Sequence, residues 1–400
     1  MNGLAADARR LTFSRAARGF ADGLVSVLLA SYLQRLGFSA VEIGAIVTAT
    51  LIGSAALTLG VGLLGHHLPG RSILLAASTL MVATGIAFAA VTSFWPLLVV
   101  AFVGTVNPSA GDVTLFLPTE QTILTEAVAA PERTRSFAFY NLAGTLAGAV
   151  GALAAGLPAL LARFAGFDLA VAERFGFLLY AAFGILTAWT YRGLSISADV
   201  RGQERAPPLA KSRKVVLQLA ALFSLDSFGG GFVVQALLAL YLFKRFGLSI
   251  ASAGAIFFAA GLMAAFSQFM SVRLAARFGH VRTMVYTHLP SNIFLILAGL
   301  SPTLPLALLF ILLRMALSSM DVPARQAYVM EMVPREERAA AASVTNVPRS
   351  LAAAVSPVLA GWLLDHSSFG WPLLCAGILK ALYDLLLFWH FAHRKPAAEQ

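Results

Sequence analysis

Apolar stretches of about twenty residues recur along the chain, separated by short segments rich in glycine, proline or charge. A helix needs about 20 mostly apolar residues to cross the hydrocarbon core of a bilayer. Of the 400 residues, 58% are hydrophobic and only 12% are charged, which is too little polar surface to cover such stretches in water. The pattern therefore predicts an all-α membrane protein.

We expect about twelve transmembrane helices, because about twelve such stretches can be separated by loops. Their predicted ranges are 13–35, 40–65, 72–92, 96–124, 136–160, 174–192, 215–242, 250–272, 283–300, 303–329, 339–364 and 371–392.

Basic residues are distributed by side of the membrane and do not form one patch, which argues against a nucleic-acid partner despite the net charge of +10. If the N-terminus is cytoplasmic, most of the 29 lysines and arginines fall in cytoplasmic ends and loops. The opposite side carries Arg35, Arg163, Arg174, Lys244 and Arg245. This positive-inside bias predicts that both termini are cytoplasmic, and we expect the bacterial inner membrane as the location.

The N-terminal segment shows no cleavable signal and runs directly into the first predicted span. Cys375 is the single cysteine, which excludes an intrachain disulfide framework.

One passage of the sequence occurs twice. YLQRLGFSAVEIGAI at Tyr32–Ile46 is similar to YLFKRFGLSIASAGAI at Tyr241–Ile256. A second set of matches has a spacing of 205 residues and joins Pro118, Gln121, Glu126, Arg133, Asn141 and Gly156 to Pro323, Gln326, Glu331, Arg338, Asn346 and Gly361. Polar and proline positions match in register, so the repeat predicts two pseudo-symmetric six-helix bundles.

The polar segment 193–214 is predicted to be a cytoplasmic linker between an N-terminal lobe, 1–192, and a C-terminal lobe, 215–400. Two lobes with an even number of spans share one orientation in the membrane. Parallel repeats of this kind hold their substrate at mid-depth at the repeat interface, so we expect a site between the lobes.

These features resemble the major facilitator superfamily, most closely its drug and metabolite exporter branch. The resemblance is carried by the two repeated passages at Tyr32–Ile46 and Tyr241–Ile256, RLAARFGHVR at 273–282, RMALSSMDVPARQAYVMEMVPREER at 314–338 and SPVLAGWLL at 356–364. It implies the twelve-helix major facilitator fold, with a cavity lined by spans 1, 4, 7 and 10. Two departures alter the expected signatures: His66 and His67 replace an aspartate in the loop after span 2, and span 4 lacks the exporter branch's arginine, although Arg314 fills the similar position in span 10.

A charged residue inside a membrane helix costs about 2.5 to 3.5 kcal/mol or more, so each needs a partner, water or a function. Three possible pairs lie four residues apart: Arg18 with Asp22, Asp321 with Arg325, and Lys380 with Asp384. We interpret the last two as structural, whereas Asp22, near mid-depth, is equally open to a functional role. Four residues have no opposite charge three or four positions away: Asp112, Glu120, Asp226 and Arg314.

Asp112, Asp226 and Asp22 are the predicted proton-coupling residues, because a carboxyl group in an apolar cavity can bind a proton on one side and release it on the other. Asp112 is the first choice, since it follows NPSAG, whose proline and glycine loosen the helix. Asp226 and Arg314 are alternatively predicted to pair with each other within the second lobe. We expect His288 to be a hydrogen-bonded core residue.

The predicted substrate-cavity residues are Arg314 and five aromatic residues able to stack on an amphipathic ligand, Phe116, Phe228, Phe232, Tyr241 and Tyr328; packing is the alternative for each ring. The predicted cytoplasmic gate residues are Glu120, Glu126, Arg133, Arg277, Glu331 and Arg338. For Glu120 a structural role is equally open. The glycines of span 5, including Gly144 and Gly148, indicate either tight helix packing or an antiporter signature.

No phosphate-binding loop, paired cysteines or HExxH motif is present in the sequence, so we expect no enzyme, no cofactor and no metal. The predicted function is secondary active transport of a small organic solute by alternating access, with proton-coupled efflux by antiport. One alternative is proton-coupled uptake of an organic anion or other metabolite, and another is a non-transporting membrane sensor or scaffold. The expected partners are the lipid bilayer, a small-molecule substrate and protons, and the expected state is a monomer.

Asp112→Asn is predicted to abolish transport driven by a proton gradient while leaving solute exchange measurable, because the amide cannot carry a proton. Flux into proteoliposomes with and without an imposed pH gradient measures both activities. Concentrative transport at the wild-type rate would remove Asp112 from the coupling role.

Overall fold

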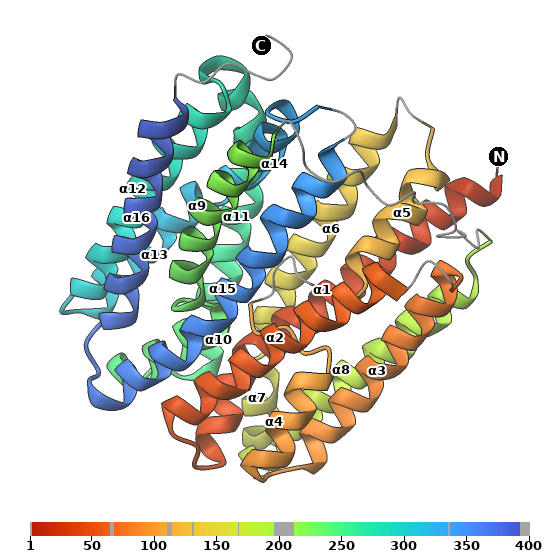
Figure 1. The fold of residues 1–400 in the computed structure, drawn as a ribbon. Coiled ribbons are helices and arrows are strands. Elements are labelled where there is room, and N and C mark those ends of the chain that lie inside the picture. The colour runs from red at the N-terminus through yellow and green to blue at the C-terminus, as the bar shows by residue number, and fades with distance from the viewer. Residues whose placement is uncertain are drawn as a thin grey trace. The chain divides into compact units, whose positions relative to one another are not determined.

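The computed structural model describes residues 2–64, 68–109, 114–129, 132–166, 168–195, 212–334 and 337–392. Its helices are α1 (Asn2–Arg35), α2 (Ala40–Leu64), α3 (Gly70–Ala90), α4 (Phe94–Val103), α5 (Leu117–Ala127), α6 (Arg133–Ala154), α7 (Leu157–Ala165), α8 (Leu169–Arg192), α9 (Arg213–Gly231), α10 (Gln235–Phe246), α11 (Ile250–Phe278), α12 (His280–Leu300), α13 (Leu304–Ser318), α14 (Asp321–Glu331), α15 (Arg338–His366) and α16 (Trp371–Phe391) (Figure 1). The predicted all-α membrane class is confirmed.

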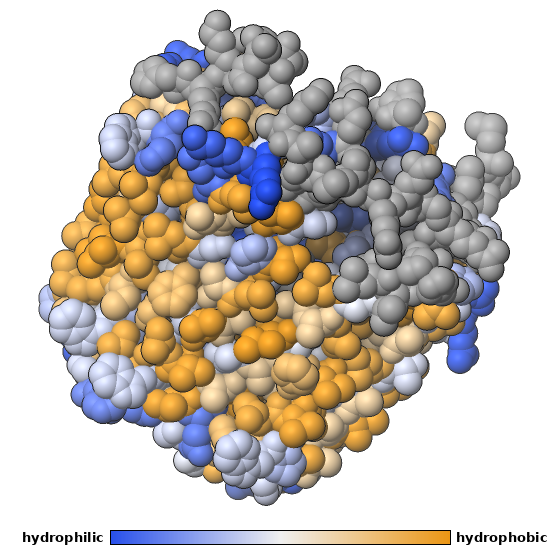
Figure 2. Space-filling view, viewed as in Figure 1, coloured by the Kyte–Doolittle hydropathy of each residue, from blue (hydrophilic) through white to orange (hydrophobic). Residues whose placement is uncertain are grey.

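Within the described ranges, 11 helical segments are long and apolar enough to cross a membrane. They coincide with eleven of the predicted spans. Large apolar side chains such as Trp189 and Trp389, exposed by 71% and 78%, cover their outer faces. Figure 2 shows hydrophobic residues across the middle of the visible face, as expected where lipid takes the place of water.

The predicted span 96–124 was wrong as a continuous helix. It forms α4 and α5, two short helices separated at Gly104, whose backbone is extended. Asn107 then accepts hydrogen bonds from the backbone and hydroxyl of Ser109, a local turn that competes with helix, and Pro108 cannot donate a helical hydrogen bond. The sequence indicated a loosened helix here, but not its full interruption.

The chain divides into two compact units. Unit 1 comprises Met1–Gln203, Gln235–Phe243 and Gly247–Phe258, and unit 2 comprises Glu204–Val234, Lys244–Phe246 and Ala259–Gln400. Most of α10 and the first turns of α11 therefore group with the N-terminal unit. The predicted lobes and linker remain a prediction.

Each unit repeats the same helix pairings. In unit 1, α1 packs along α6 and α3 packs along α8; in unit 2, α9 packs along α15 and α12 packs along α16 (Figure 1). The two repeated passages, Tyr32–Ile46 and Tyr241–Ile256, contain the same turn, where Gly37 and Gly247 have φ values of 87° and 63°. This left-handed backbone strains any residue with a side chain, which explains why both copies place glycine there.

Small residues set the distance between α1 and α6. A methyl group added to Gly23 would overlap the backbone carbonyl of Gly148, and one added to Gly151 would overlap that of Phe20. The glycine-rich sequence of α6 is thus used for close helix packing, one of its two predicted roles.

Gly23→Ala is predicted to lower the thermal unfolding temperature of the detergent-solubilised protein by several degrees, because α1 and α6 must separate, a change that costs about 1 to 3 kcal/mol. Gly60→Ala on α2 is the matched control, since a methyl group there meets nothing within 4 Å and alanine favours helix by about 1 kcal/mol. Equal unfolding temperatures for the two variants would contradict the packing argument.

Candidate functional site

A buried carboxylate on α5 forms hydrogen bonds with residues of three other helices of unit 1. Glu120 on α5 is fully buried and accepts hydrogen bonds from Arg18 of α1, Tyr140 of α6 and Tyr191 of α8, the last at 2.6 Å. The guanidinium of Arg18 also lies over the ring of Phe116, 4.3 Å from its centroid. Arg18 was therefore wrongly predicted to use Asp22 as its ion-pair partner.

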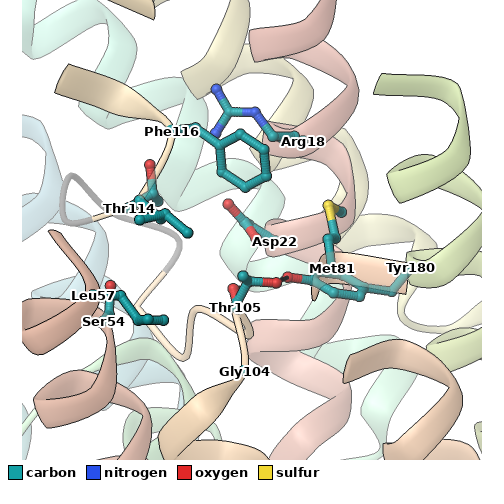
Figure 3. Close-up of a pocket in the computed structure, with 11 residues that line it drawn as sticks. Arg18, Asp22, Ser54, Leu57, Met81, Gly104, Thr105, Thr114, Phe116 and Tyr180 are labelled. Carbon is teal, nitrogen blue, oxygen red and sulfur yellow. Dashed lines mark hydrogen bonds between the residues drawn. The ribbon is translucent and has the colours of Figure 1, made fainter. Parts of the chain in front are cut away.

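Asp22 lies one helical turn from Arg18 on α1 and is only 6% exposed. Within the described residues it makes no hydrogen bond or ion pair. Its carboxylate points into a narrow pocket of unit 1 bounded by Phe116, Thr114 and Thr105 (Figure 3). The pocket thus contains a carboxylate that the described protein groups leave available.

Other polar groups of this pocket are also available. The Oγ1 atom of Thr114 and the Nε and Nη1 atoms of Arg18 are buried without a hydrogen-bond partner in the described structure. By contrast, Thr105 and Tyr180 bond to each other at 3.0 Å. Leu57, Met81 and Phe116 supply apolar wall. A carboxylate, a hydroxyl and guanidinium N–H groups therefore meet in a pocket of about 10 Å³, which has room for a proton or about one water molecule.

Unit 2 contains a larger buried charge cluster, centred on Asp226 of α9. Its carboxylate lies 2.6 Å from the Lys380 ammonium of α16, 3.3 Å from the Arg325 guanidinium of α14 and 3.7 Å from the His288 ring of α12. All four residues are less than 10% exposed. Asp226 therefore bonds to three other helices of its unit, as Glu120 does in unit 1.

The cluster continues along α12 and α16. Asp384 accepts a hydrogen bond from Asn292 at 2.8 Å and lies 2.9 Å from Nδ1 of His288. His288 is hydrogen-bonded, as predicted, but it belongs to a charged cluster that was not predicted. Its position four residues from Asn292, on one helix face, was the available sequence signal.

In unit 2, two predicted pairings are wrong and one is confirmed. Lys380 bonds to Asp226 and not to Asp384. Within the described residues no carboxylate lies within salt-bridge distance of Arg314, whose Nη1 instead contacts the sulfur of Met315 at 3.2 Å. The local pair of Asp321 and Arg325 is present at 3.3 Å.

The predicted aromatic cavity residues occupy different settings within their units. Phe228 packs edge-on against Phe232 at a centroid distance of 5.5 Å. Tyr241 is buried in α10, and Tyr328 belongs to the unit 2 core beside Phe391. Phe116, which lines the Asp22 pocket, is the one of the five that contacts a described pocket.

The predicted gate residues other than Glu120 lie near helix ends. Glu126 is exposed, Arg133 donates to the carbonyl of Val128 at 3.4 Å, Arg277 lies over Phe278, and Glu331 lies 2.9 Å from His280. Arg338 begins α15, but its side chain lies outside the described part of the structure, as do Asp112, His66 and His67. The coupling role of Asp112 stays a prediction.

Lys380→Met is predicted to destabilise unit 2 by about 3 to 5 kcal/mol, because Asp226 loses its shortest ion pair while buried. Adding Asp226→Asn should recover much of that loss, since no unpaired carboxylate remains. Arg314→Met is the control and should cost less, as it breaks no described ion pair. Thermal unfolding in detergent measures these three variants and the single variant Asp226→Asn; additive losses in the double variant would show that Asp226 and Lys380 are not partners.

Comparison with known proteins agrees with this architecture. An uncharacterized membrane protein of Saccharomyces cerevisiae, YJR124C, is 26% identical over 400 residues, covering 91% of this chain and 89% of the relative.

Solved transporters share the fold at low sequence identity. A D-xylose–proton symporter is 16% identical with a TM-score of 0.75, covering 96% of this chain and 97% of that one. A bacterial homolog of the human lysosomal transporter Spinster, in an inward-facing conformation, is 14% identical with a TM-score of 0.73, covering 97% and 98%. The nucleoside transporter NupG is 13% identical with a TM-score of 0.72, covering 97% and 100%.

The family model of the Major Facilitator Superfamily matches residues 11–226 and 219–400, which together span both units. This match indicates a transporter and not an enzyme. The chain therefore belongs to the Major Facilitator Superfamily.

Proposed function

We propose that this protein is a secondary active transporter that exports a small organic solute in exchange for protons by alternating access. The observation that carries the proposal is Asp22, a buried carboxylate that faces a pocket and has no hydrogen-bond or ion-pair partner in the described structure. A carboxylate in such surroundings is costly to keep ionised, so it can take up a proton and release it when its surroundings change.

The neighbouring cation does not neutralise Asp22 by direct contact. Arg18 uses one nitrogen to bond Glu120 and lies over Phe116, whereas its remaining N–H groups are unpartnered within the described residues. Proximity to this positive charge favours release of a proton from Asp22 when the pocket is open to water. The arrangement provides a proton site and, beside it, donors for a polar solute.

A proton-coupled uptake of an organic anion is the second candidate. It is favoured by Arg314, whose Nε is buried without a hydrogen-bond partner and which has no carboxylate within salt-bridge distance in the described chain. A guanidinium in that state suits a carboxylate or phosphate group of a solute. A sensor or scaffold without transport activity is the third.

The similar structures carry names that mention nucleosides and D-xylose, the latter with proton symport. Their chemical variety supports a small organic solute for this chain without selecting one class, since one fold serves many solutes. The drug and metabolite exporter branch, residence in a bacterial inner membrane, cytoplasmic termini and a monomeric state belong to the same proposal.

Asp22→Asn is predicted to reduce proton-driven transport at least tenfold while solute exchange continues, because an amide cannot carry the proton. The assay uses proteoliposomes containing an internal pH dye and a panel of nucleosides, sugars and amino acids. Asp168→Asn is the matched control, since Asp168 caps the start of α8 and asparagine caps equally well.

The direction of flux distinguishes the candidates. Outward movement of solute against inward protons supports export, and inward accumulation supports uptake. Proton-driven transport that persists in Asp22→Asn would overturn the coupling role of Asp22. Absence of flux for every solute tested would favour the sensor.

A further inference from the structure

One buried ion pair in each unit joins a long helix to a short one. In unit 1, Arg18 of α1 bonds to Glu120 of α5. In unit 2, Asp226 of α9 bonds to Arg325 of α14. The two long helices begin the repeated halves, and the two short helices each have 11 residues.

The short helices correspond by sequence. Pro118 and Gln121 of α5 match Pro323 and Gln326 of α14 at a spacing of 205 residues. The same spacing places Glu120 at the position of Arg325. An acid in one unit therefore occupies the place of a base in the other.

The long helices correspond by their packing. A methyl group on Gly23 of α1 would overlap the carbonyl of Gly148 on α6, and one on Gly231 of α9 would overlap the carbonyl of Ala353 on α15. Gly148 and Ala353 are again 205 residues apart, so the two contacts are copies of each other.

The two glycine contacts also align the charged residues of α1 and α9. Arg18 precedes Gly23 by five residues, and Asp226 precedes Gly231 by five residues. Arg18 and Asp226 therefore occupy the same place in their units, with opposite charge.

We infer that these two ion pairs are one duplicated device with its charges exchanged: each fixes its short helix, α5 or α14, on the long helix of the same unit. We call them the joining pairs. An isolated helix of 11 residues is marginal on its own, so α5 and α14 depend on such contacts for their position. The four charged residues are positioning residues, and this inference does not depend on the solute or on proton coupling.

The two joining pairs have different neighbouring groups, and the difference is explained by the balance of charge in each unit. In unit 1 the single base Arg18 pairs with the single acid Glu120. The neutral hydroxyls of Tyr140 and Tyr191 donate the remaining hydrogen bonds to the Glu120 carboxylate. In unit 2 Arg325 is shared with Asp321 at 3.3 Å, so Asp226 receives only part of its charge. Lys380, 2.6 Å from Asp226, supplies the missing cation.

Hydrogen exchange of the full-length protein in detergent, resolved by mass spectrometry, tests the inference. Glu120→Gln is expected to raise the exchange rate of amides in α5 at least tenfold and to leave α14 unchanged. Arg325→Met is expected to raise exchange in α14 and to leave α5 unchanged. Arg18→Met combined with Glu120→Gln should return α5 toward wild-type protection, because neither member of the pair is left charged without the other.

Glu173→Gln is the matched control in unit 1. Glu173 is also fully buried and pairs at 3.0 Å with Arg35, which ends α1, whereas Arg18 lies near the middle of that helix. It should loosen that end without exposing α5. If Glu120→Gln does not fold, Arg18→Lys, which keeps the charge, must retain more α5 protection than Arg18→Met. Exchange that rises equally in α5 and α14, or in neither, overturns the inference, and either result leaves the transport proposal standing.

Discussion

Charge burial inside a membrane protein is the constraint that organises this structure. Glu120 and Asp226 are nearly or fully removed from solvent, and each draws donors from three other helices of its own unit. A buried charge without partners costs several kcal/mol, so each of these carboxylates requires the helices that carry its partners to lie against its own helix. Lipid cannot replace them, because it offers no hydrogen bonds.

The fold was largely predictable because hydrophobic span length and the internal repeat are local or periodic signals. The ion pairs and hydrogen bonds of the two buried clusters were less predictable. Pairs four residues apart were expected to bond, yet Arg18 turns to Glu120 and Lys380 turns to Asp226 across helices. Sequence spacing reports what lies on one helix face, whereas the choice of partner depends on which faces meet. Asp321 and Arg325 kept their local pair while Arg325 also reached α9.

The break between α4 and α5 was also only partly predictable from the sequence. Pro108 and Asn107 signalled a weak point between α4 and α5, but the extent of the break depends on backbone groups that find partners outside a helix. The break matters for the site because Thr105 and Thr114, which both lie between the end of α4 and the start of α5, line the pocket of Asp22. In a continuous helix these two residues, nine positions apart, would be separated by more than two helical turns.

Comparing the two repeated units shows which buried charges both units have and which belong to one unit alone. The joining pairs occur in both units, which is expected of a structural requirement that survives exchange of charge. Asp22 has no such counterpart: four residues beyond Arg18 the first unit has a carboxylate, whereas four residues beyond Asp226 the second has Gly230. A lone buried carboxylate adds cost without completing any described pair, so its retention in one unit is better explained by binding a proton or solute than by stability.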